Sequence, residues 1–151
     1  MTSTSASCKD ECEALMSALL PVAERILSEQ RALRPFGCTL SMSDQIVQVG
    51  GFRPDTTLDD ATLIAQFQES FRDGAARGEL KATALSYSAR ARTKTGTQDA
   101  VFVHLNHRDK YSIVVTFPYH FSADDELVIE EPFANDGEND VFCTASELNG
   151  P

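Results

Sequence analysis

The chain has 151 residues, 42% of them hydrophobic and 24% charged, with a formal net charge of −10. This length and composition are typical of one globular domain with its own core. No apolar run approaches the roughly 18 residues of a membrane span, and residues 1–7 lack the basic start and apolar stretch of a secretory signal. We expect a cytoplasmic protein with no membrane partner, forming one domain over residues 1–151 with a disordered start at 1–7.

The first predicted helix spans residues 9–31, where apolar residues recur at intervals of three and four along one face. Pro21 lies inside this pattern and predicts a kink or a break near Leu20. A second helix is predicted between Thr57, its expected N-cap, and Gly78, its expected end.

The strands are predicted from alternation between the turn signals. Residues 38–49 predict a hairpin between the two helices. Three longer strands follow in meander order at residues 80–93, 100–106 and 112–117, with turns expected at residues 95–97 and at Arg108-Asp109. The last of these strands is apolar on both faces, which is typical of a strand inside the sheet, because an edge strand of this kind would invite aggregation.

We therefore predict an α+β fold with a single antiparallel sheet of about five strands and both helices packed on one face. The order of helix, hairpin, helix and three-strand meander is similar to profilin-like and roadblock-type folds, in which the last long strand pairs with the first. A cone-shaped ligand-binding fold and a secretion-chaperone fold are the structural alternatives. Residues 127–129 suggest an additional short edge strand, and Val141 and Phe142 suggest a segment that returns to the core.

The charge is unevenly distributed along the chain. Up to Lys110 there are 13 basic and 14 acidic residues, whereas from Tyr111 onward there are nine acidic residues and no Lys or Arg. Such a segment repels phosphates, so we expect no nucleic-acid partner, and a basic protein surface is a better candidate than nucleic acid. The simpler interpretation is a solvated segment that aids solubility, and we expect residues 120–151 to be weakly ordered.

Several short motifs between Arg34 and Phe142 resemble a family of small bacterial α+β proteins to which no function is assigned. These motifs are Pro35-Phe36-Gly37, Gly78 to Ala82, Tyr87 with Arg90 and Arg92, Asp99-Ala100-Val101, Leu105 to Asp109, Pro118-Tyr119 and Glu131 to Ala134. The family pattern has Glu where this chain has Asn106, and Gly where it has Lys110. The resemblance implies a soluble bacterial protein and supplies no activity, substrate or cofactor.

No motif in the sequence indicates catalysis. His107-Arg108-Asp109 repeats the catalytic-loop triplet of protein kinases, but Val114 stands where that loop needs an Asn, and no Gly-rich loop is present. No G-x-S-x-G motif occurs. His104 and His107 have opposite parity on one strand, so they point to opposite faces and cannot bind one metal ion together. We expect no catalytic residue, no metal site and no cofactor.

The four cysteines are Cys8, Cys12, Cys38 and Cys143. A chain of this length with an ordinary apolar content favours reduced thiols over a disulfide scaffold. Cys8 and Cys12 are four residues apart and would share a helix face, so a metal or redox pair is the alternative to two independent thiols.

The meander predicts one candidate binding surface. If Val101, Val103 and Leu105 face the helices, alternation leaves a mixed polar and aromatic surface on the other side of the sheet. Its candidate binding residues are Arg90, Arg92, Phe102, His104 and Thr116. Such a surface suits a protein or a small anion, unless the acidic C-terminal segment covers it and shields the two arginines.

We expect a non-catalytic protein-binding or adaptor module that acts through this open sheet face, either on a partner or by self-association. Two alternatives remain open. One is a small acidic inhibitor or immunity-type protein for a basic partner, indicated by the acidic C-terminal segment. The other is a small-ligand-binding or enzymatic cone, in which His104 with Tyr87 or Tyr119 would line a pocket.

Overall fold

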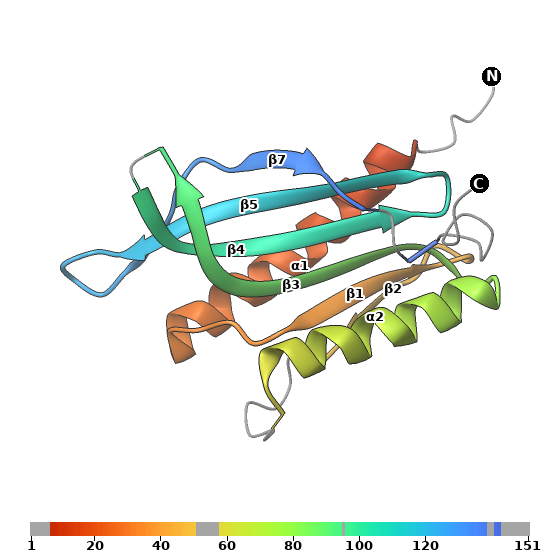
Figure 1. Cartoon of the computed structure of the whole chain (residues 1–151), viewed down its shortest axis with the longest axis horizontal. Coiled ribbons are helices and arrows are strands. Elements are labelled where there is room, and N and C mark those ends of the chain that lie inside the picture. The colour runs from red at the N-terminus through yellow and green to blue at the C-terminus, as the bar shows by residue number, and fades with distance from the viewer. Residues whose placement is uncertain (1–6, 51–57, 95, 139–140, 143–151) are drawn as a thin grey trace.

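The computed structural model describes residues 7–50, 58–94, 96–138 and 141–142. The described residues form two helices and seven strands in one antiparallel sheet (Figure 1). The elements are α1 Cys8–Gln30, β1 Phe36–Ser41, β2 Ile46–Val49, α2 Asp60–Ala76, β3 Leu80–Thr93, β4 Gly96–His107, β5 Tyr111–Phe121, β6 Leu127–Ile129 and β7 Phe133–Asp136. The α+β class and the antiparallel sheet are confirmed, but the sheet has seven strands rather than about five.

The strand order is β2-β1-β3-β4-β5-β6, and β7 also pairs with β5. The long β5 has β4 on one side and both β6 and β7 on the other, which confirms the prediction that its doubly apolar sequence belongs inside the sheet. The pairing expected by analogy with profilin-like folds is wrong, because β1 pairs with β3 and not with β5. Residues 120–151, expected to be weakly ordered, supply both β6 and β7.

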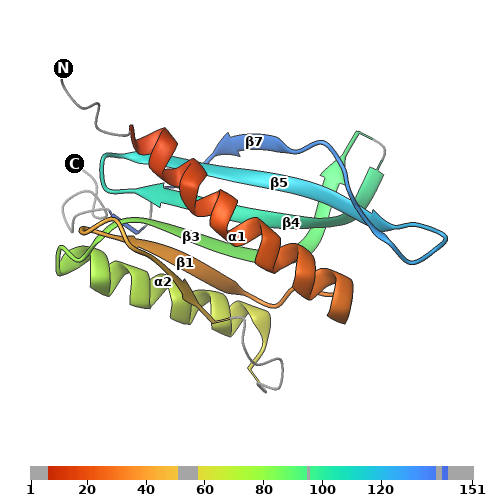
Figure 2. The ribbon, with the colours of Figure 1, turned by 180° about the vertical axis from the view of Figure 1, so that it is seen from behind.

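The two helices lie on opposite faces of the sheet, so the prediction that both pack on one face is wrong. Figure 2 shows α1 crossing one face, which we call the inner face, and Figure 1 shows α2 on the other, the outer face. Leu15, Leu19 and Leu27 of α1 are buried against inner-face residues of β1, β3, β4 and β5. On the outer face Phe71 of α2 packs with Leu85 of β3 and with Val141, which confirms the predicted return of the C-terminal segment.

Register determines which side chains share a face, because residues directly opposite each other in a sheet point the same way. Val101, Val103 and Leu105 belong to the core under α1, as predicted. The outer face carries three cross-strand rows from β3 to β7. These rows are Tyr87–Phe102–Thr116–Phe133, Leu85–His104–Val114–Asn135 and Thr83–Asn106–Ser112, the last continued by Gly137, whose N–H donates to the Ser112 carbonyl.

Local sequence explains where the helices begin. The Ser7 hydroxyl accepts a hydrogen bond from the Asp10 N–H and caps α1, which continues unbroken through Pro21. Of the two alternatives predicted at that proline, the break is wrong, and the kink within one helix stays a prediction. Thr57 lies outside the described residues, and the N-cap of α2 is Asp59, whose carboxylate accepts from the Thr62 N–H at 2.8 Å.

Gly37 is expected to be sensitive to substitution because β1 passes closely under α2 at this point. A Cβ at position 37 would collide with the backbone oxygen of Ala84 and lie 2.9 Å from Cζ of Phe71. We expect Gly37→Ala to lower the free energy of unfolding by about 1–3 kcal/mol, measured by urea denaturation.

Gly74→Ala in α2 is the matched control. Its added Cβ would meet only the Leu80 side chain, which can rotate away, and alanine favours the helix. Equal unfolding midpoints for the two variants would contradict the close approach of β1 and α2.

Candidate functional site

The outer face of β4 and β5 lies outside the main contacts of either helix. The contacts of α2 are mainly with β1 and β3, and α1 lies on the inner side. Phe102, His104 and Val114 are consequently only partly buried, and Phe133 of β7 is 40% exposed. We call these four residues and their immediate neighbours the outer β4–β5 surface.

Three aromatic rings organise this surface. The Tyr87 ring stacks on Phe102 with centroids 5.7 Å apart and on His104 with centroids 5.4 Å apart. The Tyr87 hydroxyl and His104 Nε2 share a hydrogen bond of 2.8 Å. Burial raises the pKa of Tyr87, so its hydroxyl stays protonated in this contact. The stacked rings present a preformed surface rather than three independent side chains.

The structure brings together only part of the candidate set predicted from sequence. Phe102 and His104 lie on the outer β4–β5 surface, whereas Thr116 is on the same face but only 2% exposed. Arg90 and Arg92 pair with Asp99 and Thr97, which gives them the parity of the inner face. Their predicted place beside Phe102 is therefore wrong.

The length of the β3–β4 connection explains this error. The prediction assumed a three-residue turn at 95–97, but Thr93 already pairs with Gly96, which leaves two residues between the strands. A change of one residue in register moves every side chain of a strand to the other face. Arg90 bonds to Asp99 of the adjacent strand at 3.0 Å, so this arginine is paired within the sheet rather than with the C-terminal segment.

A cavity of about 220 Å³ adjoins the outer β4–β5 surface. It lies where α2 and the chain after β7 approach β4 and β5. Its polar lining residues are Gln68, His104, Asn106, Ser112, Asp136 and Glu138. Of the two tyrosines considered with His104 as pocket residues, Tyr87 contacts it on the outer face, and Tyr119 is buried in the inner core.

A wider groove of about 550 Å³ lies at the curled end of the β3–β4 hairpin. Its lining includes Arg92, Lys94, Glu130 and Glu131, so opposite charges face each other across it. The Glu130 carboxylate also accepts hydrogen bonds from Gln98 and His120, which lower its pKa. Of the charged residues in this groove, Glu130 is therefore already engaged with neutral neighbours at the end of the sheet.

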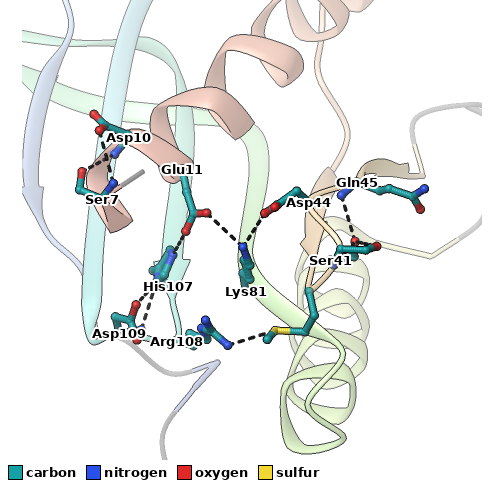
Figure 3. Close-up of polar contacts among 12 residues, drawn as sticks. Ser7, Asp10, Glu11, Ser41, Asp44, Gln45, Lys81, His107, Arg108 and Asp109 are labelled. Atoms are coloured by element: carbon teal, nitrogen blue, oxygen red, sulfur yellow. Dashed lines mark hydrogen bonds and ion pairs between the residues drawn. The ribbon is translucent and has the colours of Figure 1, made fainter. Parts of the chain in front are cut away.

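His107 forms a second polar cluster at the opposite side of the sheet (Figure 3). The Asp109 N–H donates to His107 Nδ1 at 3.0 Å, and His107 Nε2 lies 2.7 Å from Glu11 Oε1 of α1. Because Nδ1 accepts, Nε2 carries the proton and donates to Glu11. Lys81 Nζ contacts the other Glu11 oxygen at 3.4 Å and Asp44 at 2.5 Å. The cluster ties the start of α1 to β3 and to two turns.

The His107 cluster stabilises the fold and does not resemble a reaction centre. The His107 side chain is 1% exposed and both ring nitrogens are engaged, so no external group can reach it. Sequence reasoning missed the contact because Glu11 and His107 are 96 residues apart. One signal was available in the sequence. Glu11 directly precedes Cys12 at the edge of the apolar side of the first helix, so its carboxylate was placed to need a partner from the sheet.

The cysteines lie in settings that disfavour thiolate chemistry. Cys12 is 1% exposed, and burial, with smaller contributions from Cys8 and Glu11, raises its pKa to about 12. Burial raises the pKa of Cys38 to about 11. Cys143 lies outside the described residues. Within the described ranges, no group of three or more His, Cys, Asp or Glu residues is placed to hold a metal ion.

Comparison of this chain with protein-family models, curated proteins and solved structures gave no match. The resemblance to a bacterial family therefore stays a prediction, and any functional argument depends on the site itself. Neither described helix combines the length and the hydrophobicity that crossing a membrane requires.

Truncating His107 tests the buried cluster. His107→Ala leaves Glu11 and the Asp109 N–H without their buried partner, so we expect a loss of about 2–4 kcal/mol in the free energy of unfolding. His120→Ala is the matched control, because the His120–Glu130 pair is 53% and 39% exposed and we expect little change. Similar urea midpoints for both variants would refute the role assigned to His107.

Alkylation tests the environment of the cysteines. At pH 8 a thiol with a pKa of about 12 is almost wholly protonated, so Cys12 offers far less thiolate than an ordinary cysteine. We expect iodoacetamide to modify partly exposed Cys8 in the folded protein and to spare Cys12 and Cys38 until guanidinium unfolds the chain. Peptide mass spectrometry would report the sites, and rapid labelling of Cys12 in the folded state would contradict the prediction.

Proposed function

We propose that this protein is a non-catalytic binding module that recognises a protein partner through the outer β4–β5 surface. The observation that carries the proposal is the stacked Tyr87, Phe102 and His104 group on strands that α2 leaves uncovered. Partly exposed aromatic side chains beside polar groups are typical of the energetic centre of an interface.

The rigidity of this surface supports the proposal. Strand β4 is paired along its length with β3 and β5, and β5 is paired on both edges. The rings also restrain one another through stacking and through the Tyr87–His104 hydrogen bond. A preorganised surface loses little conformational entropy when a partner binds, which leaves more of the contact energy for affinity.

The use of the reactive side chains also favours binding over catalysis. Both ring nitrogens of His107 are hydrogen-bonded within the fold, and Cys12 and Cys38 are buried thiols. We propose a cytoplasmic location, because cysteines stay reduced in that compartment.

The acidic-inhibitor alternative is favoured by one specific observation. Some acids of the C-terminal segment already have partners. Asp125, for example, forms an ion pair with Arg31 at 3.0 Å. Glu138, however, lines the cavity beside the outer β4–β5 surface, whereas Asp136 pairs with Ile113 and therefore has the parity of the inner face. A basic partner would therefore meet the same surface that the aromatic group forms, and the two hypotheses describe one binding site.

The proposed function predicts that a charge on the outer β4–β5 surface abolishes partner binding. Phe102→Asp and Val114→Asp each place a carboxylate among its apolar contacts, and we expect affinity to fall at least about thirtyfold. The partner would be cross-linked to the wild-type protein in its host, identified, purified and titrated by calorimetry against each variant.

Ser17→Asp is the matched control, because Ser17 lies on the exposed side of α1 and receives the same charge. Its affinity should equal that of the wild type, and circular dichroism should show all three variants folded. Equal affinity of Phe102→Asp and wild type would reject the proposal. So would a wild-type dimer in light scattering that Phe102→Asp dissociates, because the surface would then serve self-association.

A further inference from the structure

One buried polar group in the cavity beside the outer β4–β5 surface lacks a hydrogen-bond partner. Asn106 of β4 is 5% exposed, and the Ser112 hydroxyl donates to its Oδ1 at 2.8 Å. The amide nitrogen at the other end has no partner among the described residues, although the side chain lines the cavity. Buried polar groups are nearly always paired, so this free donor points to an acceptor on a group that enters the cavity.

The surroundings of Ser112 determine which end of the Asn106 amide is free. Asn106 and Ser112 are directly paired across β4 and β5, so their side chains share the outer face. The Gly137 N–H donates to the Ser112 carbonyl, and a Cβ at position 137 would collide with the Ser112 hydroxyl. The absence of a side chain at Gly137 thus leaves room for the hydroxyl that engages the Asn106 oxygen. The amide nitrogen is the end that remains for a ligand.

A second amide reaches the cavity from the helix. Gln68 of α2 lines the cavity, and its amide also has no hydrogen-bond partner within the described part of the chain. A glutamine amide carries an acceptor and two donors. A ligand between α2 and β4 therefore meets a donor from the strand and both kinds of group from the helix.

The charge of the ligand follows from the residues around the cavity. A carboxylate or phosphate would find no Lys or Arg among the described lining residues, and from Tyr111 onward the chain has nine acidic and no basic residues. An ammonium or guanidinium group has only donors and would leave the Asn106 donor unpaired. The donor of Asn106 and the scarcity of positive charge together favour a neutral acceptor.

The volume limits the size of the ligand. Sites for small molecules typically enclose roughly 300–1,000 Å³, and this cavity of about 220 Å³ is smaller. One side chain suits it better than a cofactor. A carboxamide carries its acceptor and its donors on separate atoms, so it can accept from Asn106 and bond to Gln68 at the same time.

We propose that the cavity lined by Gln68 and Asn106 takes the carboxamide of an asparagine or glutamine side chain of the partner protein. This inference rests on the proposed function, since it names the chemistry of the partner at the same surface. The carboxamide would lie beside the stacked aromatic group, because His104 belongs to that group and also lines the cavity.

The test uses a defined probe rather than the partner. N-acetyl-glutamine-N-methylamide is titrated into the ¹⁵N-labelled full-length protein. The methionine analogue is one ligand control, because it has the same backbone amides and an apolar side chain of similar length. The glutamate analogue is the other, because it adds a charge in the same shape. We expect saturable NMR shifts of the Asn106 and Gln68 side-chain amides with the glutamine compound alone.

Two variants remove the proposed contacts. Asn106→Asp keeps the acceptor for Ser112 and removes the free donor, and Gln68→Met removes the second amide at similar size. Each should weaken binding of the glutamine compound about fivefold, as expected for one lost hydrogen bond. Gln66→Met is the matched control, because Gln66 lies on the exposed side of α2 outside the cavity, and its affinity should be unchanged. If Asn106→Asp does not fold, the comparison of Gln68→Met with Gln66→Met decides.

Three outcomes would overturn the carboxamide site. They are equal shifts with the methionine or the glutamate compound, equal weakening by Gln68→Met and Gln66→Met, and no saturation, which would mean that water alone satisfies Asn106. Loss of partner binding in Phe102→Asp is a separate readout. The aromatic surface can therefore be rejected while the cavity still binds the glutamine compound, and the reverse result is equally distinguishable.

Discussion

The packing of α1 across the inner face is the constraint on which the rest of the structure depends. Leu15, Leu19 and Leu27 of this 23-residue helix are fully buried against core residues of the strands from β1 to β5. The outer face is left with α2, which has 17 residues and packs mainly on β1 and β3. Because one helix covers most of the inner face, the described residues supply no other long element for the outer face of β4 and β5. The exposed surface is thus a consequence of how two unequal helices divide one sheet.

A polar contact fixes where α1 lies on that face. Leucine packing alone tolerates sliding along a sheet, since the hydrophobic effect is not directional. Glu11 removes this freedom, because its two oxygens meet His107 and Lys81 from two different strands. Buried charges cost desolvation energy, so such a contact is retained more readily for positional specificity than for stability. His107 lies at the end of β4, and its contact with the Asp109 N–H also orders the turn into β5. This turn sets the register of β5 against β4, and with it the alignment of the outer rows.

The sequence predicted the features that depend on local pattern. Strand β3 has the predicted bounds, β5 lies inside the sheet, and the β6 strand and the return of Val141 occur as expected. Apart from the break that Pro21 suggested within α1, the errors concern information that is not local. Apolar periodicity shows that α2 is amphipathic but does not say which face it covers. One residue of difference in the β3–β4 turn placed Arg90 and Arg92 on the wrong side. Strand β7 has a polar sequence, and it is a strand because β5 offers it a free edge. Of the candidate site, the sequence placed Phe102 and His104 on one face and offered Tyr87 or Tyr119 beside His104, whereas the choice of Tyr87 and the stacking of its ring required the tertiary structure.

The aromatic group and the cavity are close enough to bind one short segment. Phe102, His104 and Asn106 follow each other at every second position of β4, so they point to the same face and roughly 13 Å separates the first from the last. An extended partner segment has the same spacing between side chains four residues apart. An apolar residue seated on Phe102 would then place a side chain at the cavity in the same segment. Each contact alone would be small, because it would involve only one or two side chains of the partner. Joining them on one rigid strand would make the second contact intramolecular, and under the proposed function this coupling would let a small patch select a partner.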